Sequence, residues 1–257
     1  VFMPDIRYAQ NENVDRGDLR MQVIERGTST PIDDAKISIS YSGDPDSTVE
    51  EVNTDASGMS ETLTLDTPPL ELSMQPSEVQ PYAEYTIQVT AKGYRPINIS
   101  GIEVFSGQLS LQEIRMDAEE AAESMTDNIV IPAHTLFAEY PPKIAEAEIK
   151  PVTETGEIVL SRVVIPEYVI VHDGAPSDPT ARDYYVRYRD YIKNVASSEI
   201  YSTWPDTTIR ANVLAIMSFT LNRVYTEWYR NKGYSFTITS STAYDQKFMY
   251  GRNIYQS

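Results

Sequence analysis

An alternation of polar and apolar side chains with a period of two residues dominates the first part of the chain. It recurs in five short segments that Gly, Pro, Asp and Asn turns separate: residues 18–23, 36–41, 61–65, 84–89 and 97–100. This period places successive side chains on opposite faces, as in strands that bury one face. We therefore expect an all-β sandwich over residues 17–117. Residues 1–16 show no sustained pattern and are predicted to form a flexible N-terminal arm.

Residues 184–228 follow a helical period instead, and they predict two helices that meet at Trp204 and Pro205. In the first helix Tyr188, Ile192 and Val195 recur at steps of four and three residues, so they form one stripe. Glu199 is the next position on this stripe. The sequence therefore places one carboxyl group on the packed side of a helix.

The second helix is predicted to begin at Pro205, because proline has no amide hydrogen and suits a first helical turn. Asp206 lies favourably near the positive end of this helix. From Ile209 onward apolar residues occupy several sides, which predicts a central, buried helix. Gly233 is the expected left-handed stop after this region.

Prolines divide the region between the two predicted bodies. Pro132, Pro141 and Pro142 cannot donate to a sheet, so residues 118–155 are expected to form an extended linker or edge strands. Residues 157–160, 163–171 and 234–239 are further strand candidates. The predicted fold class is thus multi-domain, with a β-sandwich followed by an α+β domain at residues 156–257.

Charge separates the same two parts of the chain. The 257 residues carry a net charge of −17, yet residues 181–257 hold ten Lys and Arg against six Asp and Glu. This part is therefore +4, and residues 1–180 carry −21. An acidic chain argues against nucleic acid as a partner, since such binders neutralise phosphates. No apolar run approaches the roughly 20 residues of a transmembrane segment.

The sequence offers no metal or cofactor site. It has no cysteine, which excludes disulfides and thiolate ligands. The acidic residues between Asp44 and Asp55 lack the spacing of a calcium loop, so a solvated loop is favoured. His134 and His172 are isolated, and a structural or exposed position is favoured for both.

Three short motifs carry a resemblance in the N-terminal part. They are Thr-Pro-Ile-Asp-Asp-Ala at residues 30–35, Thr-Asp-Ala-Ser-Gly at 54–58, and Tyr-Thr-Ile-Gln-Val at 85–89 followed by Gly93 and Tyr94. In this order they resemble the carboxypeptidase-regulatory-like, or transthyretin-like, β-sandwich. The resemblance implies a spacer or adhesive module.

A second resemblance covers residues 186–250. It rests on the segment from Arg189 to Glu199, on Trp204-Pro205, on the aliphatic helix through Asn222-Arg223, and on Ile238-Thr239 and Asp245-Gln246. These residues resemble the stage II sporulation protein D (SpoIID) and amidase-enhancer LytB family. The family's domain continues beyond the length found here, so residues 156–257 are read as an incomplete domain or as one reduced to a scaffold.

The resemblance implies lytic transglycosylase activity on peptidoglycan, with Glu199 as the catalytic acid and base. The residue pattern is compatible with this role, because burial on an apolar stripe raises the pKa of a carboxyl group. Residue type suggests sugar stacking or hydrogen bonding for five others: Tyr191, Tyr201, Trp204, Asp245 and Gln246. Trp228 is a further candidate for sugar stacking, and a core position is favoured for both Trp204 and Trp228.

Three functions remain open at this stage. The first is a glycan-strand lyase at the cell wall, the second a non-catalytic wall-binding or amidase-enhancer module, and the third a structural subunit of a secreted or phage-tail-like assembly. The expected partners are peptidoglycan glycan strands, with a cell-wall amidase or self-assembly as further possibilities. The first two functions imply an extracellular or cell-wall location.

Overall fold

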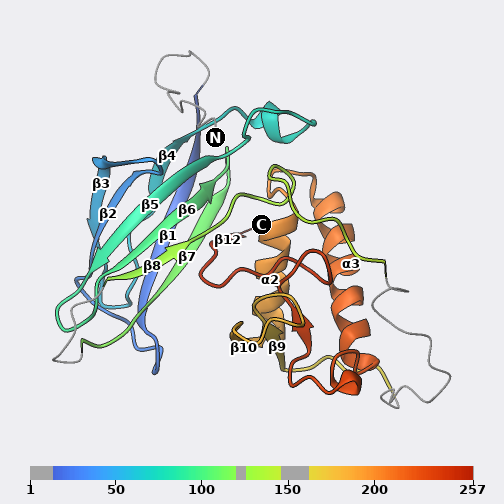
Figure 1. Cartoon of the computed structure of the whole chain (residues 1–257). Coiled ribbons are helices and arrows are strands. Elements are labelled where there is room, and N and C mark those ends of the chain that lie inside the picture. Colours follow the sequence, from blue (N-terminus) through green and yellow to red (C-terminus); the bar gives the residue numbers. More distant parts are fainter. Residues whose placement is uncertain (1–13, 120–125, 146–161, 257) are drawn as a thin grey trace. The chain divides into compact units, whose positions relative to one another are not determined.

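The computed structural model describes residues 14–119, 126–145 and 162–256. Within these ranges the chain is mostly β-sheet with two α-helices (Figure 1). It divides into two compact units. The first comprises Val1–Ala133, Ser202–Trp204 and Gly251–Ser257, and the second comprises His134–Tyr201 and Pro205–Tyr250.

The first unit contains two sheets. One has the order β12-β7-β1-β4, with β1 at Asp15–Glu25, β4 at Leu63–Thr67, β7 at Leu109–Met116 and β12 at Ile254–Gln256. The other has the order β3-β2-β5-β6-β8, with β2 at Lys36–Tyr41, β3 at Asp44–Asn53, β5 at Ala83–Thr90, β6 at Ile97–Val104 and β8 at Asp127–Val130. The pairs β1–β7 and β6–β8 are parallel, and the other pairs are antiparallel. A short 3₁₀ helix, η1 (Leu70–Ser73), follows β4.

Apolar side chains from both sheets form one core, so this unit is a β-sandwich. Met21 of β1, Ile39 of β2 and Ile87 of β5 are fully buried in it. The alternation in the sequence predicted β1, β2, β4, β5 and β6. It missed β3, where the acidic residues between Asp44 and Asp55 were interpreted as a solvated loop. It also missed β7, because the buried positions there include the polar Ser110 and Gln112, which hide the alternation.

The C-terminal segment belongs to the sandwich, in contrast to the expectation of one domain over residues 156–257. β12 pairs with β7, and Gln112 Nε2 donates to Gly251 O at 2.9 Å. Arg252 forms a buried ion pair with Glu103 of β6, and Asn253 Nδ2 donates to Glu103 O at 2.8 Å. Burial raises the pKa of Glu103 to about 7, although Arg252 acts in the opposite direction.

The predicted linker is not uniformly extended. β8 is an edge strand of the sandwich, which was the alternative expected for this region. Beyond it, Thr135 Oγ1 donates to Ser198 O at 2.8 Å, and Ile144 N donates to Ala243 O at 2.7 Å, both within the second unit. Residues 146–155 lie outside the described residues. Of the predicted N-terminal arm, residues 15 and 16 already belong to β1.

The second unit combines a small sheet with the two helices. Its strands are β9 (Tyr168–His172), β10 (Asp183–Arg187) and β11 (Ile238–Thr239), in the order β10-β9-β11. Its helices are α2 (Tyr188–Glu199), α3 (Asp206–Tyr225) and the 3₁₀ helix η2 (Arg230–Lys232). Residues 184–187, expected to be helical, are instead strand, and the strand candidate at 157–160 lies outside the described residues.

The predicted stripe of α2 is present, since Tyr188, Ile192 and Val195 are all buried. The prediction that the second helix is central and buried is wrong. Only Ile216, Thr220 and Arg223 of α3 are buried, and Leu214 is 62% exposed. The apolar residues on several sides of this helix therefore did not predict how many of its sides pack against the protein.

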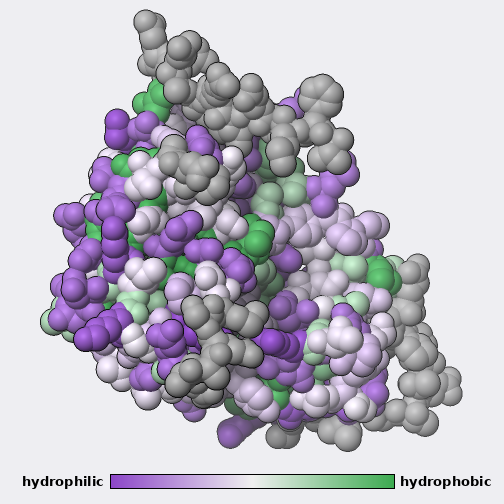
Figure 2. Space-filling model, turned by 60° about the vertical axis from the view of Figure 1, so that its left-hand side comes forward, coloured by the Kyte–Doolittle hydropathy of each residue, from purple (hydrophilic) through white to green (hydrophobic). Residues whose placement is uncertain are grey.

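Pro205 immediately precedes α3 and accepts hydrogen bonds from the amides of Thr208 and Ile209. Gly233 has a φ of 87° and ends η2 rather than α3. No helix in the described part of the chain has the length and apolarity to cross a bilayer. On the face drawn in Figure 2, hydrophobic residues form small areas among hydrophilic ones.

The packing of the sandwich around Gly101 of β6 leads to a stability prediction. Gly101 has a φ of 81°, and a Cβ there would lie 2.2 Å from Ile131 O. We expect Gly101→Ala to lower the free energy of unfolding by about 2 kcal/mol or more, because strain and overlap add. Chemical denaturation measures this change.

Gly27→Ala is the matched control, since a Cβ at Gly27 meets no atom within 4 Å and its φ is ordinary. We expect that variant to change the free energy of unfolding by no more than about 1 kcal/mol. Equal costs for the two variants would contradict the tight packing at Gly101.

Candidate functional site

Glu199 is the last residue of α2 and lies mostly buried, at the end of the apolar stripe. Its Oε1 accepts a hydrogen bond of 2.7 Å from the backbone amide of Lys247. Burial raises the pKa of Glu199 above its ordinary value of 4.5, while the Lys247 amide and the positive charge of Lys143 act in the opposite direction. The negative end of the helix also disfavours the charged form. Glu199 is thus a carboxyl group suited to holding a proton.

The position of the Lys247 amide depends on how residues 245–249 are held. We call these five residues the anchored segment. At its end, the side chain of Asn194 of α2 forms two hydrogen bonds with the backbone of Met249. Its Nδ2 donates to Met249 O at 2.8 Å, and its Oδ1 accepts from Met249 N at 2.9 Å. Asn194 lies between Tyr191 and Val195 on α2, so the helix that carries Glu199 also holds this segment.

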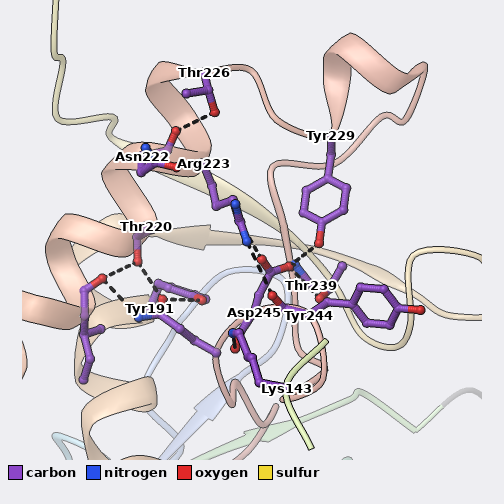
Figure 3. Close-up of polar contacts among 12 residues, drawn as sticks. Lys143, Tyr191, Thr220, Asn222, Arg223, Thr226, Tyr229, Thr239, Tyr244 and Asp245 are labelled. Carbon is purple, nitrogen blue, oxygen red and sulfur yellow. Dashed lines mark hydrogen bonds and ion pairs between the residues drawn. The ribbon is translucent and has the colours of Figure 1, made fainter. Parts of the chain in front are cut away.

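Asp245 holds the beginning of the anchored segment. Its carboxylate accepts from Arg223 Nε at 2.8 Å, from the Tyr229 hydroxyl at 2.6 Å, and from Thr239 N and Oγ1 at 2.9 and 2.7 Å (Figure 3). The Arg223 and Asp245 side chains are almost completely buried. A buried charge is tolerated only when it is paired and hydrogen-bonded, as it is here.

The Arg223 guanidinium is also enclosed by aromatic rings. Its Cζ lies 4.5 Å from the ring centre of Phe219 and 4.3 Å from that of Trp228. Trp228 thus belongs to the core of the second unit, where it packs with Tyr229 and Phe236. This position agrees with the interpretation of Trp228 as a core residue rather than as a platform for sugar stacking.

Gln246 is equally internal. Its Oε1 accepts from Thr220 Oγ1 at 2.8 Å and from the Tyr191 hydroxyl at 3.2 Å, and its Nε2 donates to Ile216 O at 3.1 Å. Burial raises the pKa of Tyr191 well above its ordinary range, so its hydroxyl remains a donor. The side chains of α2 and α3 therefore engage both the amide oxygen and the amide nitrogen of Gln246.

Tyr191, Asp245 and Gln246, expected as substrate contacts, have internal positions in this structure. The three side chains are buried, and their polar atoms are engaged by the protein. In this structure their hydrogen bonds hold the anchored segment.

The two remaining expected substrate contacts lie in different units. Tyr201 is buried in the second unit, where its ring lies 4.6 Å from that of His134. Trp204 is half-buried in the first unit, and its indole Nε1 donates to Ser73 O at 3.0 Å. Within the second unit, Glu199 and Tyr191 contact the anchored segment, to which Asp245 and Gln246 belong.

Lys143 and Lys247 both affect the pKa of Glu199, and no sequence pattern identified either residue. Lys143 donates from Nζ to Asp245 O at 2.6 Å and acts on the pKa of Glu199 by its charge. It follows two prolines in a region predicted as linker, where no periodicity marks a packed residue. Lys247 acts through its backbone amide, which no residue type reveals.

The site has no grouping that suggests a metal centre. Across residues 14–119, 126–145 and 162–256, no three His, Cys, Asp or Glu side chains converge as metal ligands would. Glu199 Oε1 accepts from the Lys247 amide.

No family model matches the chain, and no curated protein matches it. Among solved structures it is similar to 5-hydroxyisourate hydrolase of Klebsiella pneumoniae, at 16% identity over 40% of this chain and 92% of that one, with a TM-score of 0.27. It is also similar to wild-type catechol 1,2-dioxygenase of Acinetobacter radioresistens, at 13% identity and a TM-score of 0.28. That match covers 46% of this chain and 58% of the dioxygenase, so the chain spans little more than half of its length.

A third similar structure is a putative membrane-associated protein of unknown function from Bacteroides fragilis. The identity is 16%, the TM-score is 0.23, and the match covers 43% of this chain and 30% of that one. All three TM-scores are low, and no inference about function is drawn from these similarities.

The buried pair of Arg223 and Asp245 predicts a large and non-additive loss of stability. We expect Asp245→Asn to lower the free energy of unfolding by about 3–5 kcal/mol, because it leaves the Arg223 charge without its carboxylate. Adding Arg223→Met should then cost much less than its own single effect. Urea denaturation followed by tryptophan fluorescence measures all four members of this cycle.

Arg210→Gln is the control, since it removes an exposed pair with Asp206 on the same helix. We expect that variant to cost less than about 1 kcal/mol. Strictly additive costs of Arg223→Met and Asp245→Asn would show that the pair does not hold the anchored segment.

Proposed function

We propose that the protein acts on peptidoglycan and cleaves the β-1,4 bond between MurNAc and GlcNAc as a lytic transglycosylase does, with Glu199 as acid and base. One observation carries the proposal. The Glu199 carboxyl lies mostly buried at the end of α2, its pKa is raised by burial, and an amide of the anchored segment fixes its orientation. The resemblance of residues 186–250 to the SpoIID and LytB family supports the choice of reaction.

A single carboxyl group suffices for this reaction. The protonated acid donates its proton to the glycosidic oxygen, and the bond from that oxygen to C1 of MurNAc breaks. The C6 hydroxyl of the same sugar then attacks C1 and transfers its proton to the Glu199 carboxylate. The products are an anhydro sugar and a free GlcNAc hydroxyl, and the acid is restored without consuming water.

The two opposing influences on the pKa of Glu199 match this cycle. Burial favours the protonated acid that begins the reaction, whereas the Lys247 amide and the Lys143 charge support the carboxylate that forms midway. A general acid that becomes a base needs both forms to be accessible near the working pH. The environment of Glu199 contains a stabilising feature for each form.

The two units carry different parts of the proposal. We assign the sandwich to the carboxypeptidase-regulatory-like type, as a spacer, and the second unit to the SpoIID and LytB type. Within the second unit, the excess of basic over acidic residues lies after residue 180, and this part of the unit suits a wall polymer that carries carboxylates. The proposal places the protein outside the cell or at the cell wall, with glycan strands as its partner.

A second function is a wall-binding or amidase-enhancer module that does not cut. The observation in its favour is that Tyr191, Asp245 and Gln246 are engaged within the protein rather than presented to a ligand. In that case Glu199 has a structural role beside the Lys247 amide. A cell-wall amidase, or further copies of the chain, would then be the partner in addition to glycan strands.

Glu199→Gln separates the two functions. Glutamine keeps the acceptor for the Lys247 amide but cannot donate an acidic proton, so we expect release of anhydro-muropeptides from purified sacculi to fall by at least about 100-fold. Chromatography of the digested wall with mass detection measures this product. Glu113→Gln, which alters a glutamate of the sandwich, should leave the release unchanged.

Wild-type protein that releases no anhydro-muropeptides would contradict the catalytic proposal and favour the non-cutting module. Unchanged release by Glu199→Gln would assign the acid to another residue. Circular dichroism of both variants shows whether the folds are retained.

A further inference from the structure

The hairpin of β9 and β10 presents two unlike faces. In its register Tyr168 is opposite Arg187, and Ile170 is opposite Tyr185. Val169 and Val171 lie on the other face and are fully buried. Because side chains alternate along a strand, Tyr168, Tyr185 and Arg187 project together from the face that is not buried by these valines. We call these three residues the hairpin face.

The two tyrosines of the hairpin face are unusually exposed for ring side chains in a packed sheet. Tyr185 is 75% exposed and Tyr168 is 44% exposed. In the described part of the chain β10 is at the edge of its sheet, with β9 as its one neighbouring strand. A single exposed aromatic residue needs no explanation. Two of them in diagonal positions, about 7–8 Å apart, provide a stacking surface for one ligand.

Arg187 adds a positive charge beside the Tyr168 ring. Its guanidinium Cζ lies 5.8 Å from the ring centre of Tyr168, and within the described residues no carboxylate forms an ion pair with it. Asp183, on the same face of β10, is already engaged, since Oδ1 meets His172 Nδ1 at 2.7 Å and Oδ2 accepts from Ser235 Oγ at 3.3 Å. The charge of Arg187 is therefore available to an anion.

The hairpin face is also held rigidly. Five residue pairs join β9 and β10, and Tyr188 N donates to Glu167 O at 2.9 Å directly beside the face. Arg187 precedes the first residue of α2, and its side chain makes no capping hydrogen bond. Its guanidinium is thus not needed to begin the helix. Such preorganisation lowers the entropic cost of binding a ligand.

We propose that the hairpin face binds a glycan strand that carries carboxylates, with sugar rings on Tyr168 and Tyr185 and a carboxylate on Arg187. Apolar sugar faces suit exposed tyrosine rings, and the guanidinium matches a carboxylate in charge and shape. This inference rests on the proposed action on peptidoglycan. It names a subsite separate from Glu199, at the opposite end of α2 and about 18 Å away for 12 residues of helix.

The test uses two soluble probes. One is peptidoglycan glycan strands freed of their peptides, which retain the lactyl carboxylates, and the other is neutral chitin oligomers. All variants carry Glu199→Gln, so that cleavage cannot consume the probe. We expect Tyr185→Ala and Tyr168→Ala to weaken binding of both probes by about ten-fold, because both probes need the rings. Calorimetry measures the affinities.

Arg187→Gln should weaken binding of the carboxylate-bearing strands by about ten-fold and leave chitin binding nearly unchanged. It should also flatten the salt dependence of the charged probe. Arg210→Gln is the matched charge control, and Leu214→Ala removes exposed apolar surface from α3. Neither control variant should alter binding.

Equal affinity of the hairpin variants and their parent, or no affinity of the parent for either probe, would overturn the inference. A change of oligomeric state in Tyr185→Ala without a change of affinity would overturn it too, in favour of a second copy of the chain. Failure of the proposed cleavage is seen separately, as absent anhydro products from the protein with Glu199 intact. Loss of binding in the hairpin variants supports the subsite whether or not the protein cleaves glycan strands.

Discussion

The second unit depends on one constraint, which is that the buried Asp245 carboxylate must be fully paired. Arg223, Tyr229 and Thr239 meet it from α3, from the turn after α3 and from β11. These partners are distant in sequence, so the carboxylate joins three elements at one point. The neighbouring residues are then fixed in turn, because Gln246 and Met249 bind α3 and α2. The Lys247 amide reaches Glu199 as a consequence of this arrangement.

Two carboxyl groups near this point have opposite surroundings. Asp245 has a cation and several donors in direct contact, whereas Glu199 has one backbone amide and a more distant Lys143 charge. The balance for Glu199 favours desolvation, and its pKa rises. Carboxyl groups placed close together in unlike surroundings can take unlike roles. Here the first holds the structure, and the second is the group we propose for proton transfer.

The sequence predicted those features that follow from local periodicity. The β-sandwich strands were visible where buried positions are apolar, as at Ile37 and Ile39, and the stripe of α2 correctly placed Glu199 at its end. Features set by tertiary contacts were not visible. β7 buries Ser110 and Gln112, β12 returns to the sandwich from the end of the chain, and α3 packs on one side although its apolar residues occupy several.

The same division applies to the candidate site. Residue type suggested sugar stacking for Tyr191 and hydrogen bonds to a sugar for Asp245 and Gln246, but it could not show that these side chains are buried and hydrogen-bonded within the protein. Lys143 acts on Glu199 by its charge and lies in a proline-rich segment, and Lys247 acts through its main-chain amide. Neither effect is visible as a sequence pattern. The exposed tyrosines of the hairpin face likewise became visible only once the strand register was known.

The most direct test of this account is a titration of the Glu199 carboxyl carbon by nuclear magnetic resonance in the whole chain, with Glu199→Gln to assign the signal. The account predicts a midpoint above 4.5, because burial outweighs the Lys247 amide and the Lys143 charge. Lys143→Met should raise the midpoint further, since it removes a charge that stabilises the carboxylate. A midpoint at or below 4.5 would contradict the account, because Glu199 would then be an ordinary ionised carboxylate at neutral pH.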